Sequence, residues 1–346
     1  MSRPGMGEGT VGVCLAGFGH WGRNLARNFF QLGALRAICE SDTARLEGIA
    51  AQYPGVRTYA RYEDALEDNE CNAVALATPA EQHYPMALRA LEAGRDVFVE
   101  KPLALDPDDG MHMISKAAAR GRILMVGHLL RYHPAILKIR QLIESGWLGK
   151  VEYIYSNRLS MGKIRREENA LWSFAPHDIS VILALIGHMP VQVTATGGAY
   201  LQPNIADVTV SSLLFDNGTR SHIFVSWLHP HKEQRLVVIG SKRMIVFEDS
   251  RPDNKLVAFD QKIEMRNGNL EAGKVEGIPV EFEHEEPLRR ECLHFLQSVA
   301  ARSKPVTCGE EGLRVLRVLQ ACQRSLQMGG EPVQVDSRAM LRVMNM

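Results

Sequence analysis

Residues 11–22 read Val-Gly-Val-Cys-Leu-Ala-Gly-Phe-Gly-His-Trp-Gly. The first six residues form an apolar run typical of a buried strand, and residues 21–32 have the amphipathic pattern of a helix. Gly17, Gly19 and Gly22 form a G-x-G-x-x-G pattern between the two. The first glycine allows a tight turn, the second lets backbone approach a pyrophosphate, and the third lets the helix pack against the strand. The stretch therefore predicts a dinucleotide-binding turn.

An acidic residue follows the second apolar run, which covers residues 35–39. Glu40 lies 23 positions after Gly17, close to the ~20 expected for the group that binds the adenosine ribose hydroxyls. Ser41 and Asp42 offer no cation to a 2′-phosphate, although Arg45 follows one turn later. The pattern favours NAD over NADP. The residues expected to contact the coenzyme from this pattern are Gly17, Gly19, His20, Trp21, Gly22, Glu40 and Ser41.

Strand and helix patterns alternate through the first 128 residues, which we take as an NAD-binding domain (1–128). This alternation implies parallel pairing with right-handed crossovers, and so a doubly wound Rossmann sheet in an α/β protein. The expected strands cover residues 11–16, 35–39, 56–59, 73–77, 97–99 and 123–126, and the expected helices cover 21–32, 43–52, 62–67, 83–93 and 108–120.

The pattern changes in the second half, which we take as a substrate-binding and oligomerisation domain (129–346) whose C-terminal helices can pack back on the first. Asp216-Asn217-Gly218 predicts a hairpin turn. This half is expected to be an α+β domain with a large, open, mostly antiparallel sheet. Its expected strands cover residues 151–159, 191–200, 208–215, 220–227, 235–239 and 244–247, and its expected helices cover 176–186, 288–302 and 310–328.

Composition excludes several classes of protein. The chain of 346 residues is 45% apolar and 23% charged, which is ordinary for a globular protein. Its 40 basic and 40 acidic residues cancel, so nucleic acid is not an expected partner. No apolar stretch reaches the ~18 residues of a membrane span, and the N-terminus lacks a secretory pattern. The six cysteines show no C-x-x-C pairing, so we expect reduced core cysteines in a cytoplasmic protein.

Two residues outside the glycine turn are candidates for chemistry. Lys101, in Glu100-Lys101-Pro102, follows a parallel strand at the edge where such sheets bind ligands. Its charge can stabilise a developing oxyanion during hydride transfer. His177 follows Pro176 at an expected helix start, where the helix dipole favours a neutral imidazole that can accept a proton. A surface lysine and a packing or capping histidine are the ordinary alternatives.

These motifs together resemble the glucose–fructose oxidoreductase, inositol dehydrogenase and rhizopine-catabolism (Gfo/Idh/MocA) family of NAD(P)-dependent sugar oxidoreductases. The resemblance covers nearly the whole chain and rests on residues 17–22, Ala77-Thr78-Pro79 with His83, Glu100-Lys101-Pro102 and Pro176-His177-Asp178. It implies that Thr78, Pro79, His83, Glu100 and Lys101 contact the coenzyme.

The resemblance also implies that Lys101 and His177 flank the reacting hydroxyl, and that one of them takes its proton. Many family members have Asp or Asn four residues before the histidine, where this chain has Ser173. A charged orienting partner for His177 is therefore missing, unless Asp178 or a neighbour replaces it, and the choice between His177 and Lys101 as proton acceptor stays open.

The substrate prediction rests on a basic segment before the expected helix. Residues 155–172 contain four basic side chains, and arginine matches phosphate in a bidentate fork, although Glu167 and Glu168 could neutralise them. Together with residues 127–134, the segment resembles the sugar-nucleotide branch, whose members oxidise the C3 hydroxyl of UDP-N-acetylglucosamine or of its uronic acid. The expected substrate-binding residues are Lys101, Tyr132, Arg158, Arg165, Trp172 and His177.

That resemblance implies UDP-N-acetylglucosamine as substrate and a 3-keto product, which a pyridoxal-phosphate aminotransferase converts to a 3-amino sugar for lipid A or O-antigen. The uronic acid, a free polyol of the inositol type and an NAD-binding regulator without activity are the alternatives. We expect no metal, since His229 and His231 lack acidic or cysteine partners at ligand spacing. We expect a homodimer or homotetramer through a sheet face carrying Val208, Val210 and Leu213.

Overall fold

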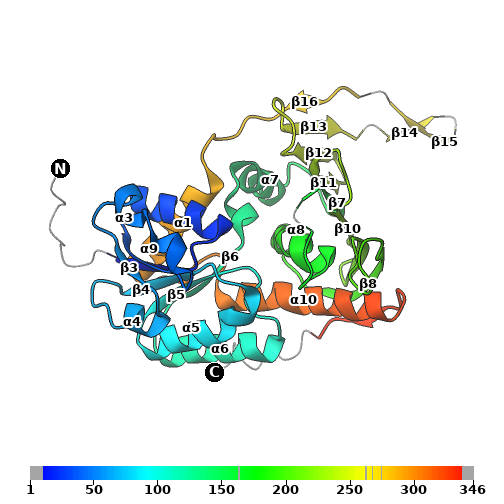
Figure 1. Cartoon of the computed structure of the whole chain (residues 1–346). Coiled ribbons are helices and arrows are strands. Elements are labelled where there is room, and N and C mark those ends of the chain that lie inside the picture. The colour runs from blue at the N-terminus through cyan, green and yellow to red at the C-terminus, as the bar shows by residue number, and fades with distance from the viewer. Residues whose placement is uncertain (1–10, 163, 262, 267, 274, 337–346) are drawn as a thin grey trace. The chain divides into compact units, whose positions relative to one another are not determined.

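The chain folds into two compact units (Figure 1). The computed structural model describes residues 11–336 apart from residues 163, 262, 267 and 274. The first unit comprises Met1–Tyr132 and Glu285–Leu316, and the second comprises His133–His284 and Arg317–Met346. No helix in the described part of the chain combines the length and apolar character needed to cross a bilayer.

The first unit contains a six-stranded parallel sheet in the order β3-β2-β1-β4-β5-β6. This order confirms the predicted doubly wound sheet, and its direction reverses between β1 and β4, where such sheets bind dinucleotides. The strands are β1 (Val13–Ala16), β2 (Leu35–Cys39), β3 (Arg57–Tyr59), β4 (Ala73–Leu76), β5 (Asp96–Glu100) and β6 (Leu124–Gly127).

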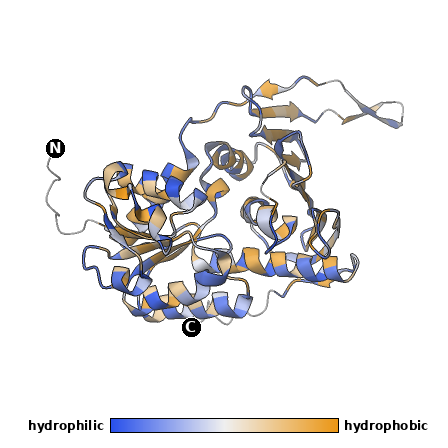
Figure 2. Cartoon of the chain, viewed as in Figure 1, coloured by the Kyte–Doolittle hydropathy of each residue, from blue (hydrophilic) through white to orange (hydrophobic). Residues whose placement is uncertain are grey.

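Helices cover both faces of this sheet. In Figure 1, α1 and α9 lie on one side of it and α5 and α6 on the other, and Figure 2 shows α5 and α6 alternating between hydrophobic and hydrophilic residues. The helices are α1 (His20–Gln31), α2 (Thr43–Leu46), α3 (Ile49–Gln52), α4 (Tyr62–Leu66), η1 (Ala80–Gln82), α5 (His83–Glu92), α6 (Pro107–Ala119), η2 (Leu129–Tyr132) and α9 (Pro287–Ala301).

Residues 285–316 join the first unit because α9 packs into its core. Phe295 of α9 contacts Phe98 edge-to-face at 5.7 Å between ring centroids, and Phe29 of α1 completes the aromatic cluster. All three side chains are fully buried. The single helix expected over residues 43–52 is instead α2 and α3, because Gly48 adopts φ +81° between them.

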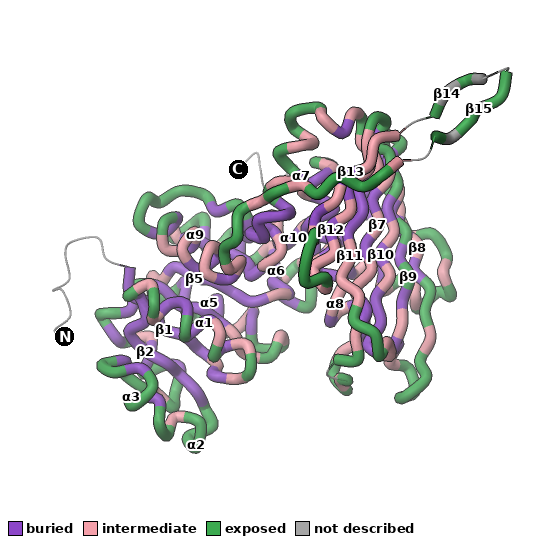
Figure 3. Tube along the Cα trace, turned by 90° about the horizontal axis from the view of Figure 1, so that it is seen from above, coloured by how far each residue is buried: buried purple, intermediate pink, exposed green. Residues whose placement is uncertain are grey.

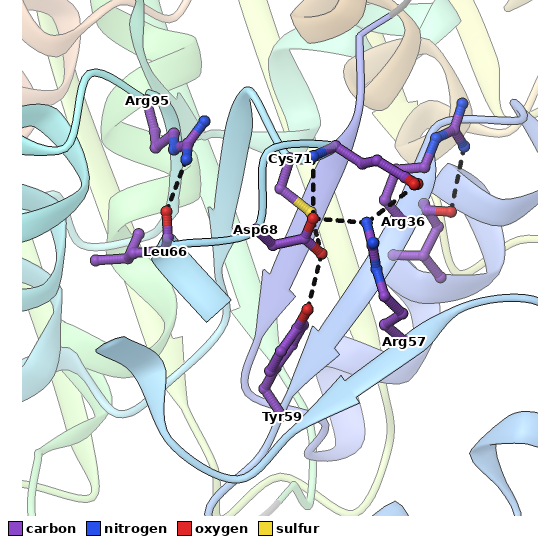
Figure 4. Close-up of polar contacts among 9 residues, drawn as sticks. Arg36, Arg57, Tyr59, Leu66, Asp68, Cys71 and Arg95 are labelled. Atoms are coloured by element: carbon purple, nitrogen blue, oxygen red, sulfur yellow. Dashed lines mark hydrogen bonds and ion pairs between the residues drawn. The ribbon is translucent and has the colours of Figure 1, made fainter. Parts of the chain in front are cut away.

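A buried carboxylate ties the amino end of β4 to β3 (Figure 4). Asp68, whose side chain is 2% exposed, accepts a hydrogen bond from Arg57 at 2.6 Å and another from the Tyr59 hydroxyl at 3.1 Å. The Glu70 N–H donates to it at 3.0 Å and the Cys71 thiol lies 3.6 Å away. This cluster lies toward the amino ends of the strands, whereas the glycine turn follows the carboxyl end of β1.

We expect Asp68→Ala to destabilise the protein by about 2–3 kcal/mol, since it removes a buried acceptor from several donors while Arg57 stays partly solvated. Glu70→Ala is the matched control: that carboxylate also pairs with Arg57, at 3.0 Å, but is 46% exposed, so its loss should cost less than about 1 kcal/mol. Denaturant unfolding measures both changes. Equal losses would contradict the role assigned to Asp68.

The second unit is built on a nine-stranded sheet in the order β16-β13-β12-β11-β7-β10-β9-β8-β17. All its pairs are antiparallel except β10 with β7, as the sequence predicts for a mostly antiparallel sheet. Its strands are β7 (Val151–Leu159), β8 (Pro190–Gly198), β9 (Val208–Phe215), β10 (Arg220–Ser226), β11 (Glu233–Gly240), β12 (Arg243–Glu248), β13 (Leu256–Asp260), β16 (Ile278–Pro279) and β17 (Val333–Gln334).

Three further helices and a small hairpin complete the part of the chain that the structure describes. Helix α8 packs on β7, β9 and β10, so one face of the nine-stranded sheet is covered. The helices are α7 (Pro134–Glu144), α8 (Ala170–Ile186) and α10 (Gly309–Gln327), and the hairpin is β14 (Ile263–Arg266) with β15 (Asn269–Ala272).

The strands alternate between more and less buried positions, which Figure 3 shows along β7 and β10. Val210 is 41% exposed, as the sequence predicts for a residue of the open face. The assignment of Leu213 to that face is wrong, because Leu213 is only 2% exposed. Side chains alternate along a strand with a period of two, so a residue three positions from Val210 lies on the opposite face, under α8.

Candidate active site

The glycine turn between β1 and α1 has the geometry that a pyrophosphate requires. Gly17 adopts φ +95°, and a Cβ on Gly22 would lie 2.0 Å from the Gly17 carbonyl oxygen, so both positions demand glycine. A Cβ on Gly19 would meet nothing within 4 Å, which leaves open space above that backbone. This open backbone at a helix N-terminus fits the pyrophosphate of a dinucleotide.

Glu40 lies at the end of β2 and is tied to the same turn. Its carboxylate accepts the Phe18 N–H at 2.8 Å and the Asp42 N–H at 3.0 Å. Burial by itself raises the pKa of this carboxyl, but the backbone N–H groups of Asp42 and Phe18, together with Arg45, bring the pKa below its usual value. Glu40 is therefore an ionised acceptor where the ribose hydroxyls of a dinucleotide are expected.

Arg45, the one cation that complicated the choice of coenzyme, is neutralised locally. Its guanidinium pairs with Asp42 at 3.0 Å and with Glu40 at 3.6 Å. The negative charge of Glu40 would repel a 2′-phosphate, so this part of the turn fits NAD.

We expect Glu40→Gln to reduce the preference for NAD over NADP by about tenfold, since the amide keeps the size of the side chain but removes the charge that repels a 2′-phosphate. The measurement is the ratio of the two dissociation constants by titration calorimetry. Glu47→Gln, at an exposed position just after α2, controls for the loss of one negative charge. An unchanged ratio in Glu40→Gln would exclude Glu40 as the selectivity residue.

The turn after β4 presents an unused hydroxyl at the point where the strand order reverses. The Thr78 Oγ1 is buried and has no hydrogen-bond partner in the described chain, which fits a group that a bound coenzyme would satisfy.

His83 is 1% exposed, and its ring nitrogens lie 3.0 Å from the Thr78 carbonyl oxygen and 2.7 Å from that of Pro102. His83 therefore links the turns after β4 and β5, with both ring nitrogens engaged by the protein. Pro79, next to Thr78, is exposed.

Glu100, Lys101 and Trp21 lie together at the carboxyl end of β5. The Trp21 indole N–H donates to Glu100 Oε1 at 2.5 Å, which joins the glycine turn to this strand end. Burial raises the pKa of the Glu100 carboxyl to about 7, although the Trp21 N–H and the Lys101 ammonium favour its ionised form. Lys101 is partly exposed at this edge. The structure thus brings the predicted lysine to the coenzyme-binding edge of the sheet.

Three other residues of the first unit surround this strand end or its neighbour β6. His128 is 1% exposed, and burial, together with Arg131 and Lys101, lowers its pKa to about 3, so it is neutral. Tyr132, which the sequence predicts to bind substrate, is buried in the first unit, and its hydroxyl lies 3.0 Å from Thr307 Oγ1. Glu291 of α9 is fully buried, and burial first and the charge of Glu100 second raise the pKa of its carboxyl.

Sequence reasoning missed Glu291. Leu288, Cys292, Phe295 and Val299 form the buried stripe of α9, and Glu291 lies within that stripe. A single acid on an apolar helix face was the signal that could have found it.

His177 lies inside α8 rather than at its start, so the predicted effect of the helix dipole on His177 is wrong. The helix begins at Ala170, and the Asn169 side chain caps it by accepting the Trp172 N–H at 3.1 Å. Pro176 is an interior residue of this helix. Helix dipoles act mainly within the first turn, which His177 has passed.

Asp178 does not serve as a free orienting partner for its neighbour. The Arg158 guanidinium donates to both Asp178 carboxylate oxygens, at 2.7 and 3.0 Å, and the Ser156 hydroxyl donates to the same carboxylate. Asp178 and Arg158 are both largely buried, with side-chain exposures of 4% and 14%. Arg158, predicted to bind substrate, is therefore held by an ion pair between β7 and α8.

The other predicted substrate residues of the second unit lie around the start of α8. The Trp172 indole N–H donates to Gln323 at 3.0 Å. Arg165 pairs with Glu168 at 2.8 Å and with Glu167 at 3.6 Å. Arg166 is exposed, and Lys163, also in the basic segment, lies outside the described residues. Much of the basic charge before α8 is thus matched by nearby carboxylates.

His229 and His231 form a local contact, in which His229 Nδ1 lies 2.5 Å from the His231 carbonyl oxygen. Across the described ranges, no group of three or more His, Cys, Asp or Glu side chains is arranged to hold a metal ion. All six cysteines are buried free thiols.

A coenzyme turn on a six-stranded parallel sheet, together with a second unit built on a large, mostly antiparallel sheet, is typical of two-domain dinucleotide-dependent oxidoreductases. Residues 11–128 match the model of the oxidoreductase family with an NAD-binding Rossmann fold, and residues 136–246 match the Gfo/Idh/MocA C-terminal domain. The chain belongs to the Gfo/Idh/MocA oxidoreductase family, and its coenzyme is NAD.

Relatives of known activity extend over both domains. UDP-N-acetylglucosamine 3-dehydrogenase of Acidithiobacillus ferrooxidans is 30% identical over 329 residues, which is 90% of this chain and 94% of the relative. Its solved structure aligns with a TM-score of 0.81 over 92% of this chain and 97% of that one, at 25% identity. Inositol 2-dehydrogenase of Rhizobium meliloti is 27% identical, covering 84% of this chain and 89% of the relative.

Proposed function

We propose that this protein oxidises the C3 hydroxyl of UDP-N-acetylglucosamine to the 3-keto sugar nucleotide with NAD. The observation that carries the proposal is the similarity to UDP-N-acetylglucosamine 3-dehydrogenase, which runs through both domains over 90% of this chain. The position of Lys101 at the coenzyme-binding edge of the first sheet also supports the proposal, because its ammonium can stabilise a developing oxyanion.

The residues divide the work as follows. When bound at the glycine turn, NAD supplies a ring that accepts a hydride. Lys101, at the carboxyl end of β5, holds positive charge against the reacting oxygen and stabilises it as negative charge develops. His177 takes the hydroxyl proton, with Lys101 as the alternative acceptor. Glu40 binds the adenosine ribose, and Thr78 offers its unused hydroxyl to the coenzyme.

Among the described basic residues before α8, Arg158 pairs with Asp178, and Arg165 with Glu167 and Glu168. The diphosphate of either sugar nucleotide needs a cation, whereas the C6 carboxylate of the uronic acid needs a further one. We therefore prefer UDP-N-acetylglucosamine, with Arg166, which is exposed, and Trp172 as candidates to contact the nucleotide.

The test compares UDP-N-acetylglucosamine, its uronic acid and myo-inositol, each with NAD. We expect NADH formation and a raised melting temperature with the first compound, because a ligand that binds only the folded state stabilises it. Faster turnover of the uronic acid or of myo-inositol would replace the proposed substrate. No NADH with any sugar nucleotide would favour an inactive NAD-binding regulator.

The product fixes the class of the next reaction. A 3-keto sugar nucleotide is a substrate for transamination, so we propose that a pyridoxal-phosphate aminotransferase consumes it, giving a 3-amino sugar for lipid A or O-antigen. The reaction is expected in the cytoplasm, where thiols such as the six buried cysteines stay reduced.

We also propose a homodimer or homotetramer formed through the open face of the nine-stranded sheet. That face carries Tyr153, Tyr155, Val210, Leu214, His222 and Phe224, according to the strand register. The same register places Asn157, Ser212 and Arg220 on this face. The apolar and aromatic side chains, among them the Tyr155 and His222 rings, which stack at 5.1 Å, form a patch beside these polar ones. Apolar patches of this kind mark association surfaces.

We expect Phe224→Glu to convert the oligomer to monomer in light scattering, because it places a charge in this apolar and aromatic patch. Leu137→Glu is the control: Leu137 of α7 is 36% exposed, and α7 packs on α8, on the opposite side of the sheet. A monomeric wild-type protein would contradict the proposed association.

A further inference from the structure

Two buried glutamates belong to the first unit, one at the end of β5 and one on α9. Glu100 ends β5 and is 8% exposed, and Glu291 on α9 is 0% exposed. Neither carboxyl oxygen of Glu291 has a hydrogen-bond partner in the described part of the chain. An ionised carboxylate that is fully buried without a donor from the protein is very costly. Glu291 is therefore neutral and holds a proton.

Of these two acids, Glu100 is the one whose ionised form the surrounding groups stabilise. The Trp21 indole N–H donates to its Oε1, and the Lys101 ammonium and backbone N–H also stabilise its ionised form. Gly127 of β6 lets the carboxyl pack closely, since a Cβ there would lie 2.8 Å from Glu100 Oε2. Burial first and the charge of Glu100 second raise the pKa of Glu291 well above its usual value, which keeps the second acid protonated.

Other ionisable groups of the first unit also act on this region: a thiol, an imidazole, a phenol and two cations. Burial raises the pKa of the Cys292 thiol on α9, and burial lowers that of His128 after β6. Lys101 is the cation next to Glu100 along the chain. Burial first and Glu291 second raise the pKa of Tyr132, which stays neutral. Arg131 is a second cation of this region and pairs with Glu311 at 3.6 Å.

We propose that Glu100 is the one of these two buried acids that ionises, and that its charge makes coenzyme affinity depend jointly on pH and on the redox state of the nicotinamide. Trp21, which belongs to the glycine turn, donates to Glu100, and the proposed function puts Lys101, the next residue, at the reacting oxygen, so we assign the Glu100 carboxylate to the nicotinamide end of the coenzyme site. The inference rests on NAD binding by the first unit and on this proposed role of Lys101, and its test needs no sugar substrate.

The proton balance gives the direction of the effect. Oxidised nicotinamide carries a positive charge and reduced nicotinamide does not, whereas both coenzymes carry the same pyrophosphate. The oxidised form therefore favours ionised Glu100 more than the reduced form does, and its binding releases more protons from the Glu100 carboxyl. Raising the pH ionises Glu100 and strengthens binding of NAD⁺ relative to NADH.

The experiment measures the dissociation constants of NAD⁺ and NADH, without sugar, at about pH 6 and about pH 8. For the wild-type protein we expect the ratio of the NADH constant to the NAD⁺ constant to rise by about tenfold with pH, given a unit charge in a partly buried site. Calorimetry in buffers of different ionisation enthalpy should show more protons released by NAD⁺ than by NADH. A pH-independent ratio would overturn the proposal.

Three variants locate the charge. Glu100→Gln should remove the pH dependence of the ratio, and Glu291→Gln should keep it, because the amide replaces an acid that is already neutral. Trp21→Phe should move the transition to higher pH, since it removes a donor to the ionised carboxylate. The wild-type proton release and the Trp21→Phe shift test the proposal even if Glu100→Gln does not fold. Loss of the dependence in Glu291→Gln, or its persistence in folded Glu100→Gln, would place the charge elsewhere.

Discussion

Lys101→Met is expected to abolish turnover, with kcat falling by about a thousandfold or more, while the dissociation constant of NAD changes by less than about threefold. The lysine lies at the carboxyl end of β5, where its ammonium can face an oxygen that becomes negative as a hydride leaves the neighbouring carbon. Methionine keeps the length and apolar stem of the side chain but removes the charge. The measurements are steady-state NADH formation and calorimetric NAD binding.

Lys116→Met is the matched control for this substitution. Lys116 of α6 pairs with Glu92 at 2.9 Å and is 25% exposed, so the same chemical change occurs in the last turn of a helix rather than at the carboxyl end of a strand. It should leave turnover unchanged. Wild-type turnover in Lys101→Met would show that the lysine has no role in the reaction. Loss of NAD binding would show that the lysine binds the coenzyme instead.

His177→Gln is expected to lower kcat by about 10²–10⁴-fold, the usual contribution of a positioned general base. The loss should be accompanied by disappearance of the acidic limb of the pH–rate profile, because glutamine cannot titrate. His188→Gln is the control, since His188 is an exposed histidine just beyond the end of α8. A near-normal kcat with an unchanged pH profile in His177→Gln would assign proton removal to Lys101.

The glycine turn and the parallel sheet could be predicted because each rests on a local steric or periodic rule. Gly17 needs a positive φ, and Gly22 has no room for a Cβ, so residue type and backbone geometry determine one another at these positions. The buried strands of the first unit are short apolar runs, and their alternation with helices dictates parallel pairing. Glu40 followed from its position at the end of the second such run.

Errors arose where a local signal had two meanings. Pro176 is typical of a helix start, but α8 begins six residues earlier, where Asn169 caps the helix. An interior proline removes one backbone hydrogen bond, and the burial of most side chains of α8 outweighs that loss. Helix α7 was not predicted, although Pro134 occupies its first turn and the His133 side chain caps it by accepting the Ala135 N–H at 3.1 Å. Caps were the underused signal in both helices.

The partners of the candidate residues could not be predicted, because they come from distant parts of the chain. Glu100 and Glu291 are far apart in the sequence, and only the packing of α9 on the first unit places Glu291 in the same unit as Glu100. The Arg158–Asp178 ion pair likewise joins β7 to α8. Composition and spacing identify acids and cations, whereas the fold decides which of them neutralise each other.

The most direct test of the account uses UDP-N-acetylglucosamine that carries deuterium at C3 of the sugar. If the protein oxidises that carbon, incubation with NAD gives NADH that contains the deuterium, and the reaction is slower than with unlabelled substrate when hydride transfer limits the rate. NADH free of deuterium, or no NADH from this sugar nucleotide, would contradict the proposed oxidation at C3.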